Sequence, residues 1–390
     1  MNNFLKDAAN AQKMPVSKRR VYYIGGFDPR GASFYHRLYK DEALKQGTKT
    51  GNHIEVGPRH KVSSHQHSWV IKSDYHQHTV NTDYRFLGWD DIVRQHWETN
   101  GLRLVALTIK GYARFIDCGA LGRIRKLYRG PFYSGIYPVA FLFITALLSI
   151  IFGGISVILV ASVGAPPVVT AMVSLLAMLA CFWMGLKLAD RLGVLWLLRT
   201  YLFVYFWGES TPDKLNARIK AFADIIVQDQ NNSPCDEVIV IGHSVGSIVA
   251  VSVVARALEQ SAEKLNLSLV TLGQCIPLLS LIPSAEAFRH DLKTLAEHPD
   301  VAWLDMVARA DALCFSQVDP IKASGIDSSM ARWPKQQIVR PFKMFSPEQY
   351  KRLKRNKLRL HFQYLMSSEY QTDYDYFLLT AGSSRLCFSE

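Results

Sequence analysis

The sharpest chemical signal in the chain is a pentapeptide, Gly-His-Ser-Val-Gly, at residues 242–246. An apolar, β-branched run at Val238–Ile241 precedes it, and an apolar run typical of a helix follows at Ser247–Leu258. A serine in this strand–turn–helix context stands on a sharp turn that presents its hydroxyl clear of the sheet. We therefore predict that Ser244 is a nucleophile. The helix N-terminus would place the Val245 N–H beside a developing oxyanion.

The same region resembles the α/β-hydrolase superfamily, particularly its lipase-like branch. The resemblance rests on the segment IGHSVGS, on the strand Val270-Thr271-Leu272-Gly273 after it, and on the chain order of the residues that follow. It covers about residues 20–35 and 211–365. It implies a nucleophile, an acid and a histidine in the order Ser…Asp…His.

The resemblance places the acid in the loop after a late strand, which we assign to Val301–Met306. Asp311 lies just beyond this strand and is the favoured acid, with Asp319 before Pro320 as the competitor. Asp305 falls inside the strand itself, which is a poor position for a triad acid. Either loop carboxylate could instead cap a helix.

The histidine that completes this order is His361, because no other histidine of the twelve follows both Asp311 and Asp319. Tyr364 stands three residues later, and this H-x-x-Tyr pattern also looks like the lipase-like branch. His243 is adjacent to Ser244 on the turn, so we expect it to line the elbow rather than to act as the base. The alternative for His361 is a packing histidine on an amphipathic helix.

An oxyanion donor is also expected from the loop after an early strand. Gly25-Gly26-Phe27 follows the β-rich run Val21–Ile24, and glycine lets a backbone N–H turn inward. Gly26 or Phe27 should supply this second N–H. The sequence departs here from the superfamily, whose loop commonly starts with HG, because Ile24-Gly25 stands in its place.

A long apolar stretch interrupts the soluble pattern, since residues 130–186 contain no Asp, Glu, Lys or Arg. A membrane-spanning helix needs about 20 apolar residues. We predict two spans near 138–162 and 168–186, joined by the turn Gly164–Pro167. Basic residues flank the pair and the turn is uncharged, which predicts two cytoplasmic arms, at the inner membrane if the protein is bacterial. The segment Leu192–Trp207 is expected to lie in the interface with Arg199 snorkelling, although a third span is the alternative.

These features divide the chain into four parts. We expect a flexible basic tail at 1–20, the first part of the hydrolase domain at 21–129, the hairpin with its interfacial helix at 130–210, and the second part at 211–390. Residues 53–86 alternate as short antiparallel strands do, whereas the later strands alternate with helices. The predicted fold is α/β, with a mostly parallel sheet flanked by helices and an inserted transmembrane hairpin.

Composition excludes other classes of protein. The chain is 49% hydrophobic and 20% charged, which rules out a disordered chain, and its six scattered cysteines predict neither a disulfide framework nor a zinc site. The net charge of +12 suits an anionic partner. The basic stretch Lys351–Arg359 is expected on an exposed helix near anionic lipid, and no nucleic-acid module is recognised. The histidine pairs 65/67 and 76/78 could hold a metal, but a polar hairpin face is the simpler interpretation.

The sequence thus predicts a membrane-anchored serine hydrolase that cleaves carboxylic esters, in particular lipid esters, with no metal or organic cofactor. The chemistry would run through Ser244, His361 and Asp311 and an acyl-enzyme intermediate. Two alternatives stay open at this stage. One is an acyltransferase that uses the same acyl-enzyme, and the other is a non-catalytic membrane scaffold that retains the fold.

Overall fold

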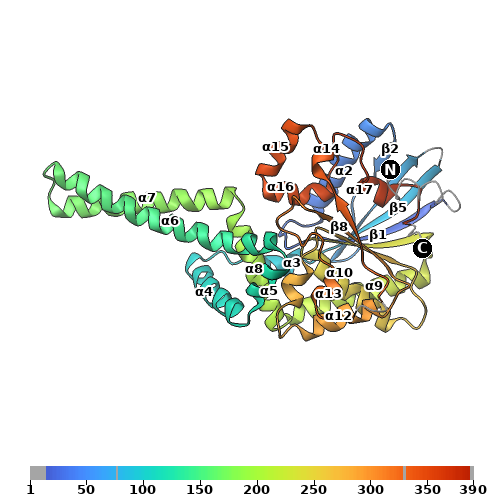
Figure 1. Ribbon diagram of the computed structural model, residues 1–390. Helices are drawn as coiled ribbons and strands as arrows, with labels where there is room; N and C mark the ends of the chain where they lie inside the picture. Colours follow the sequence, from blue (N-terminus) through green and yellow to red (C-terminus); the bar gives the residue numbers. More distant parts are fainter. Residues whose placement is uncertain (1–14, 76–77, 328–330, 387–390) are drawn as a thin grey trace.

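A single mixed sheet organises the protein (Figure 1). The computed structural model describes residues 15–75, 78–327 and 331–386. Within these residues, nine strands pair in the order β2-β4-β5-β1-β6-β7-β8-β9, with β3 beside β4. The strands are β1 (Lys18–Ile24), β2 (His53–Val56), β3 (His60–Lys61), β4 (Gln66–Tyr75), β5 (His78–Leu87), β6 (Glu237–His243), β7 (Ser268–Leu272), β8 (Ala302–Ala308) and β9 (Lys335–Val339).

The two halves of the sheet differ in direction. From β5 through β1, β6, β7 and β8 to β9 every neighbouring pair is parallel, whereas β2, β3 and β4 join as antiparallel strands. The expected antiparallel strands over 53–86 and the expected α/β architecture are therefore confirmed. Because β1 pairs with β6, the chain before the apolar hairpin and the chain after it build one sheet.

Helices cover both faces of the sheet, as a parallel sheet requires. On one face, Val238 and Val240 of β6 pack in a core with α9, α10 and α12, and on the other face Ile239 and Ile241 pack with α2 and α17. The flanking helices are α2 (Ala32–Thr50), α3 (Asp90–Gln95), α9 (Asp213–Asn232), α10 (Gly246–Gln260), α11 (Ile276–Ser280), α12 (Glu286–Ala296), α13 (Pro320–Ala323), α14 (Pro341–Met344), α15 (Pro347–Arg355), α16 (Lys357–His361), the 3-10 turn η2 (Phe362–Leu365) and α17 (Tyr376–Ala381).

Two long helices, α6 (Arg129–Ser162) and α7 (Pro167–Arg191), project from this body as a hairpin (Figure 1). Both are long and apolar enough to cross a membrane, and little of either helix is buried inside the protein. The two helices pack closely because glycines face larger side chains: a Cβ at Gly185 would lie 2.2 Å from Thr145, and one at Gly153 would lie 3.2 Å from Met178. The large outward-facing side chains are apolar, mostly aliphatic with aromatic ones such as Phe143, Phe152 and Trp183 among them.

The expected interfacial helix is corrected by the structure. Residues 194–209 form α8, which runs through the protein, with ten of its residues buried. Tyr201, Phe203 and Trp207 belong to the main core. Arg199 does not reach outward to headgroups, because its Nε donates to the Glu98 carbonyl and its guanidinium lies 4.9 Å from the Trp97 ring. Core burial, rather than a lipid surface, therefore accounts for the apolar character of this segment.

The expected flexible tail at 1–20 also needs correction at its end. Lys18, Arg19 and Arg20 belong to β1. Both arginines are buried, and their guanidinium groups donate hydrogen bonds to carboxylates and backbone carbonyls. Arg19 Nε lies 2.6 Å from Glu237 Oε2 on β6, and its Nη1 donates to the Gly382 carbonyl. Residues 1–14 lie outside the described residues.

The Arg19–Glu237 pair yields a stability prediction. Replacing Glu237 by Leu leaves a buried guanidinium without its counter-charge and should destabilise the protein by about 3–5 kcal/mol. The double variant Arg19→Met/Glu237→Leu should recover part of that loss, because no charge is then stranded. Chemical unfolding of the two variants in detergent tests this. A double variant less stable than Glu237→Leu alone would contradict the burial argument.

Candidate active site

Ser244 stands on a strained turn between β6 and α10. Its φ of 57° lies in the left-handed region, which a non-glycine residue seldom adopts without support from its surroundings. Its N–H donates to the Leu272 carbonyl on β7 at 2.9 Å, and this bond holds the turn in place. The expected sharp strand-to-helix turn is therefore present, with Ser244 at its apex.

The two glycines of the pentapeptide stand where a larger side chain would clash with the backbone. A Cβ at Gly246 would lie 2.4 Å from the carbonyl oxygens of both Ile24 and Gly25, and one at Gly242 would lie 2.6 Å from the Gly246 carbonyl. Gly246 thus lets the loop after β1 close onto the start of α10. Gly26 in that loop also lies close to the turn, since its Cβ would be 3.0 Å from the Ser244 Cβ.

His361 and Asp311 form a buried pair. His361 Nδ1 lies 2.6 Å from Asp311 Oδ2, and the two side chains are almost fully buried. Burial alone would raise the pKa of Asp311, but the charge and hydrogen bond of His361 outweigh it, so this pKa lies below its ordinary value. His361 Nε2 is buried and has no partner among the described residues. It is free to exchange a proton with a group in the cavity that His361 shares with Ser244.

The structure also separates the competing carboxylates. Asp319 accepts from the N–H groups of Ile321 and Lys322 at the start of α13, so it caps a helix and is not the carboxylate bound to His361. Asp305 lies inside β8 and accepts from Thr271 and Gln336; its burial raises the pKa of its carboxyl to about 7. Asp311 is the one of the three that contacts His361.

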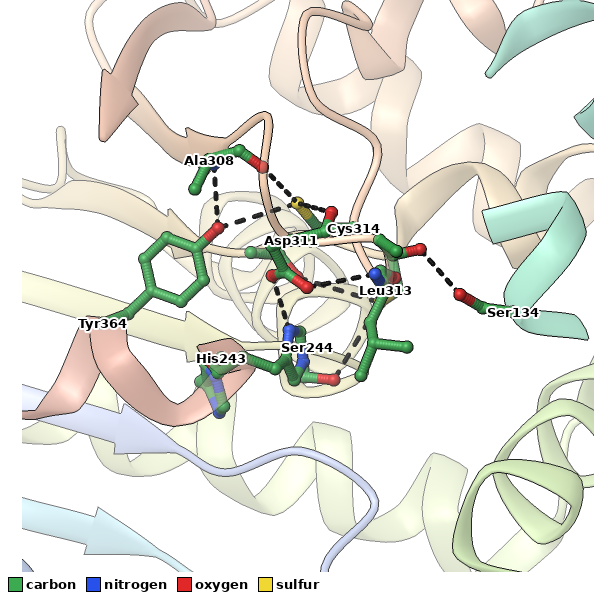
Figure 2. A network of polar contacts seen from close by, with 12 residues as sticks. Ser134, His243, Ser244, Ala308, Asp311, Leu313, Cys314 and Tyr364 are labelled. Carbon is green, nitrogen blue, oxygen red and sulfur yellow. Dashed lines mark hydrogen bonds and ion pairs between the residues drawn. The ribbon is translucent and has the colours of Figure 1, made fainter. Parts of the chain in front are cut away.

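Two residues that sequence reasoning did not assign lie against this pair. The Tyr364 hydroxyl accepts from the Ala308 N–H at the end of β8 (Figure 2), so it ties the turn after His361 to the strand before Asp311. Gly273 has a φ of 56°, and a Cβ there would lie 3.2 Å from His361 and 3.3 Å from Asp311. The H-x-x-Tyr spacing and the glycine after β7 were the available signals.

The expected oxyanion donors lie around Ser244. Val245 and Phe27 are buried, and within the described part of the chain neither the N–H of Val245 nor that of Gly26 or Phe27 donates to another protein group. Gly26 and Phe27 line the same cavity as Ser244 and His361. A buried N–H group without an acceptor in the protein costs free energy unless a ligand or water accepts its hydrogen bond. These N–H groups are therefore suited to an oxygen that carries negative charge.

The cavity above Ser244 is small and mostly apolar. It measures about 40 Å³, which is room for a few water-sized groups, and α8 forms one of its walls. Its apolar lining consists of Phe27, Trp196, Leu197, Tyr201, Leu278, Leu313, Leu358 and Phe362.

Two further titratable groups lie close to Ser244 but are poor candidates for the base or nucleophile. Burial and the neighbouring His361 lower the pKa of His243 to about 3, so His243 stays neutral at physiological pH. Cys275 Sγ lies 3.9 Å from Ser244 Oγ, yet burial raises the pKa of this thiol to about 12. A neutral thiol is a weak nucleophile, which leaves the serine hydroxyl as the better candidate nucleophile.

No family model, curated protein or solved structure matches the chain. The arguments about function therefore depend on the geometry of this site.

The histidine pairs of the antiparallel strands do not assemble a metal site in the described part of the chain, where no cluster of three or more His, Cys, Asp or Glu has the required proximity. His65 Nε2 contacts Arg218 Nη2 at 3.1 Å. His76 lies outside the described residues.

The low pKa of His243 predicts acid sensitivity. The pKa of His243 is 6.5 in the unfolded chain and about 3 in the folded protein. Between these two pH values, the His243 imidazole is protonated in the unfolded state and neutral in the folded state. Stability is therefore lost as the pH falls through this window, by about 1.4 kcal/mol per pH unit. His243→Gln should remove this contribution, measured as the difference in slope of unfolding free energy against pH. The exposed His290→Gln variant is the control; equal slopes in wild type and His243→Gln would contradict the assignment.

Proposed function

We propose that the protein is a membrane-anchored serine hydrolase of the α/β-hydrolase type that cleaves carboxylic esters. The observation that carries the proposal is the buried His361–Asp311 pair, whose free Nε2 shares one small cavity with the strained Ser244. The chain order Ser244, Asp311, His361 is that of α/β-hydrolases.

The mechanism follows from this arrangement. Ser244 Oγ attacks the ester carbonyl carbon while His361 Nε2 takes the hydroxyl proton, and Asp311 stabilises the resulting imidazolium through Nδ1–H. The N–H groups of Val245 and of Gly26 or Phe27 donate hydrogen bonds to the oxyanion. His361 then returns the proton to the leaving alcohol. Water, deprotonated by the same nitrogen, cleaves the acyl-enzyme and regenerates Ser244.

Lipid esters are the favoured substrate class. The cavity is lined mainly by aliphatic and aromatic side chains, and its wall α8 follows directly after α7. The base of α6 touches the loop of the acid, because Ser134 Oγ donates to the Ala312 carbonyl at 2.8 Å (Figure 2). A hairpin in a bilayer would hold the cavity at the lipid surface.

The proposed orientation has both arms on the cytoplasmic side. Since β1 pairs with β5 and β6, the two arms form one domain, and both must lie on the same side of a bilayer that α6 and α7 cross. Basic residues flank both ends of the hairpin and favour the cytoplasmic side: Arg125 and Lys126 before α6, Arg129 at its first position, and Lys187 and Arg191 in the last turns of α7.

A fluorophosphonate probe tests the nucleophile. The wild type should be labelled covalently, and Ser244→Ala should not, because the activated hydroxyl is removed. Cys275→Ala is the matched control, since it removes the nearest thiol and should keep the label. Mass spectrometry of the labelled peptide gives the readout. Equal labelling of wild type and Ser244→Ala would contradict the proposal, and absent labelling of both would favour a non-catalytic scaffold.

Two separate substitutions, at Asp311 and at Asp319, test which carboxylate is the acid of the triad. Asp311→Asn should lower kcat/KM for a short-chain p-nitrophenyl ester by about 10³–10⁴-fold, because the imidazolium loses its counter-charge. Asp319→Asn should lower it by less than about threefold, because a cap affects mainly local stability. The assignment fails if the two variants lose activity equally.

A further inference from the structure

Helix α4 (Gly101–Asp117) carries an unpartnered apolar stripe. Leu102, Val105, Ile109 and Ile116 are 86%, 54%, 67% and 60% exposed. Their spacing of three, four and seven residues places them on one side of the helix. Single exposed aliphatic residues are common, but four of them on one side of one helix indicate a surface that binds something apolar.

The adjacent side of α4 is fixed to the protein. Leu104 and Tyr112 pack in a separate small core with Leu198 and Leu202 of α8. The Tyr112 hydroxyl donates to the Gly135 carbonyl near the start of α6 at 2.6 Å. The helix therefore sits beside the base of the hairpin (Figure 1) with its orientation set by these contacts.

The charges around α4 are basic. Residues 101–127, which form α4 and α5 (Ala120–Leu127), contain six Lys or Arg and one acid, Asp117. Arg103 and Arg114 pair with Glu98 and Glu209, each from outside these helices. An apolar row on a basic helix pair is the pattern of a helix that lies in the interface of an anionic membrane.

We infer that α4 is an in-plane membrane helix, whose stripe enters the same bilayer as α6 and α7. This inference rests on the membrane anchoring proposed above. A lipid surface is favoured over a second copy of the chain because the contact between Tyr112 and α6 holds α4 at the base of the hairpin, and because the surrounding cations complement anionic headgroups.

This placement gives α8 a second role. Leu198 and Leu202 of α8 contact the α4 side, whereas Trp196, Leu197 and Tyr201 line the cavity of Ser244. A single layer of helix thus separates the lipid-facing helix from the cavity. Lipid substrate would reach Ser244 along α8 without passing through bulk water.

Photo-crosslinking in nanodiscs of mixed neutral and anionic phospholipid tests the inference. The full-length protein carries p-benzoylphenylalanine in place of Ile109, of Ile151 on α6, or of Leu44. Leu44 on α2 is the matched control, because it is 71% exposed and α2 packs on the other face of the sheet. Phospholipid adducts, measured by mass spectrometry, should form at Ile109 and Ile151 at least about fivefold more than at Leu44.

Each other outcome is informative, and none depends on the serine chemistry. Adducts at Ile151 but not at Ile109 would overturn the role of α4 and leave the hairpin anchor intact. A crosslinked dimer through position 109 in place of lipid adducts would identify a second copy as the occupant and overturn the inference. Absence of lipid adducts at both positions would overturn the membrane anchoring as well.

Discussion

The close approach of two backbones at the carboxyl end of the sheet is the constraint on which the site depends. The loop after β1 and the first turn of α10 touch across Gly246, where a Cβ would lie 2.4 Å from two carbonyl oxygens. This contact brings Gly26 against Ser244 and leaves buried N–H groups beside its hydroxyl. The parallel pairing of β1 with β6 maintains it, because both strands end at the same edge.

Burial sets the electrostatics of the same region. Asp311 keeps a low pKa inside the protein because His361 compensates the cost of burial, whereas Asp305, without a cationic partner in contact, has its pKa raised to about 7. His243 and Cys275 are held neutral by the same desolvation. The cavity therefore holds the Asp311–His361 pair beside groups that burial keeps neutral, and Asp28 of its lining is paired with Arg30.

The apolar insertion is integrated into the α/β domain rather than attached to its edge. The first helix of the insertion, α6, contacts the loop of Asp311 through Ser134. The helix that follows the hairpin, α8, forms a wall of the cavity. The hairpin is therefore tied to both sides of the candidate site, directly through Ser134 and by chain continuity through α8.

The sequence by itself determined the elements and most of the site. The strand before Ser244, the glycines at 242 and 246, the single histidine after the candidate acids and the uncharged stretch at 130–186 are local signals, and each is set by residue type and spacing. Tertiary structure alone decided between Asp311 and Asp319, because both lie in loops after one strand and only the fold brings one of them to His361. Tertiary structure also decided which apolar helix is buried by the rest of the protein. The segment at 192–207 is apolar apart from Arg199 and Thr200 and becomes core, whereas the mixed pattern of α4 leaves its stripe exposed, because burial depends on neighbours that lie far away in the sequence.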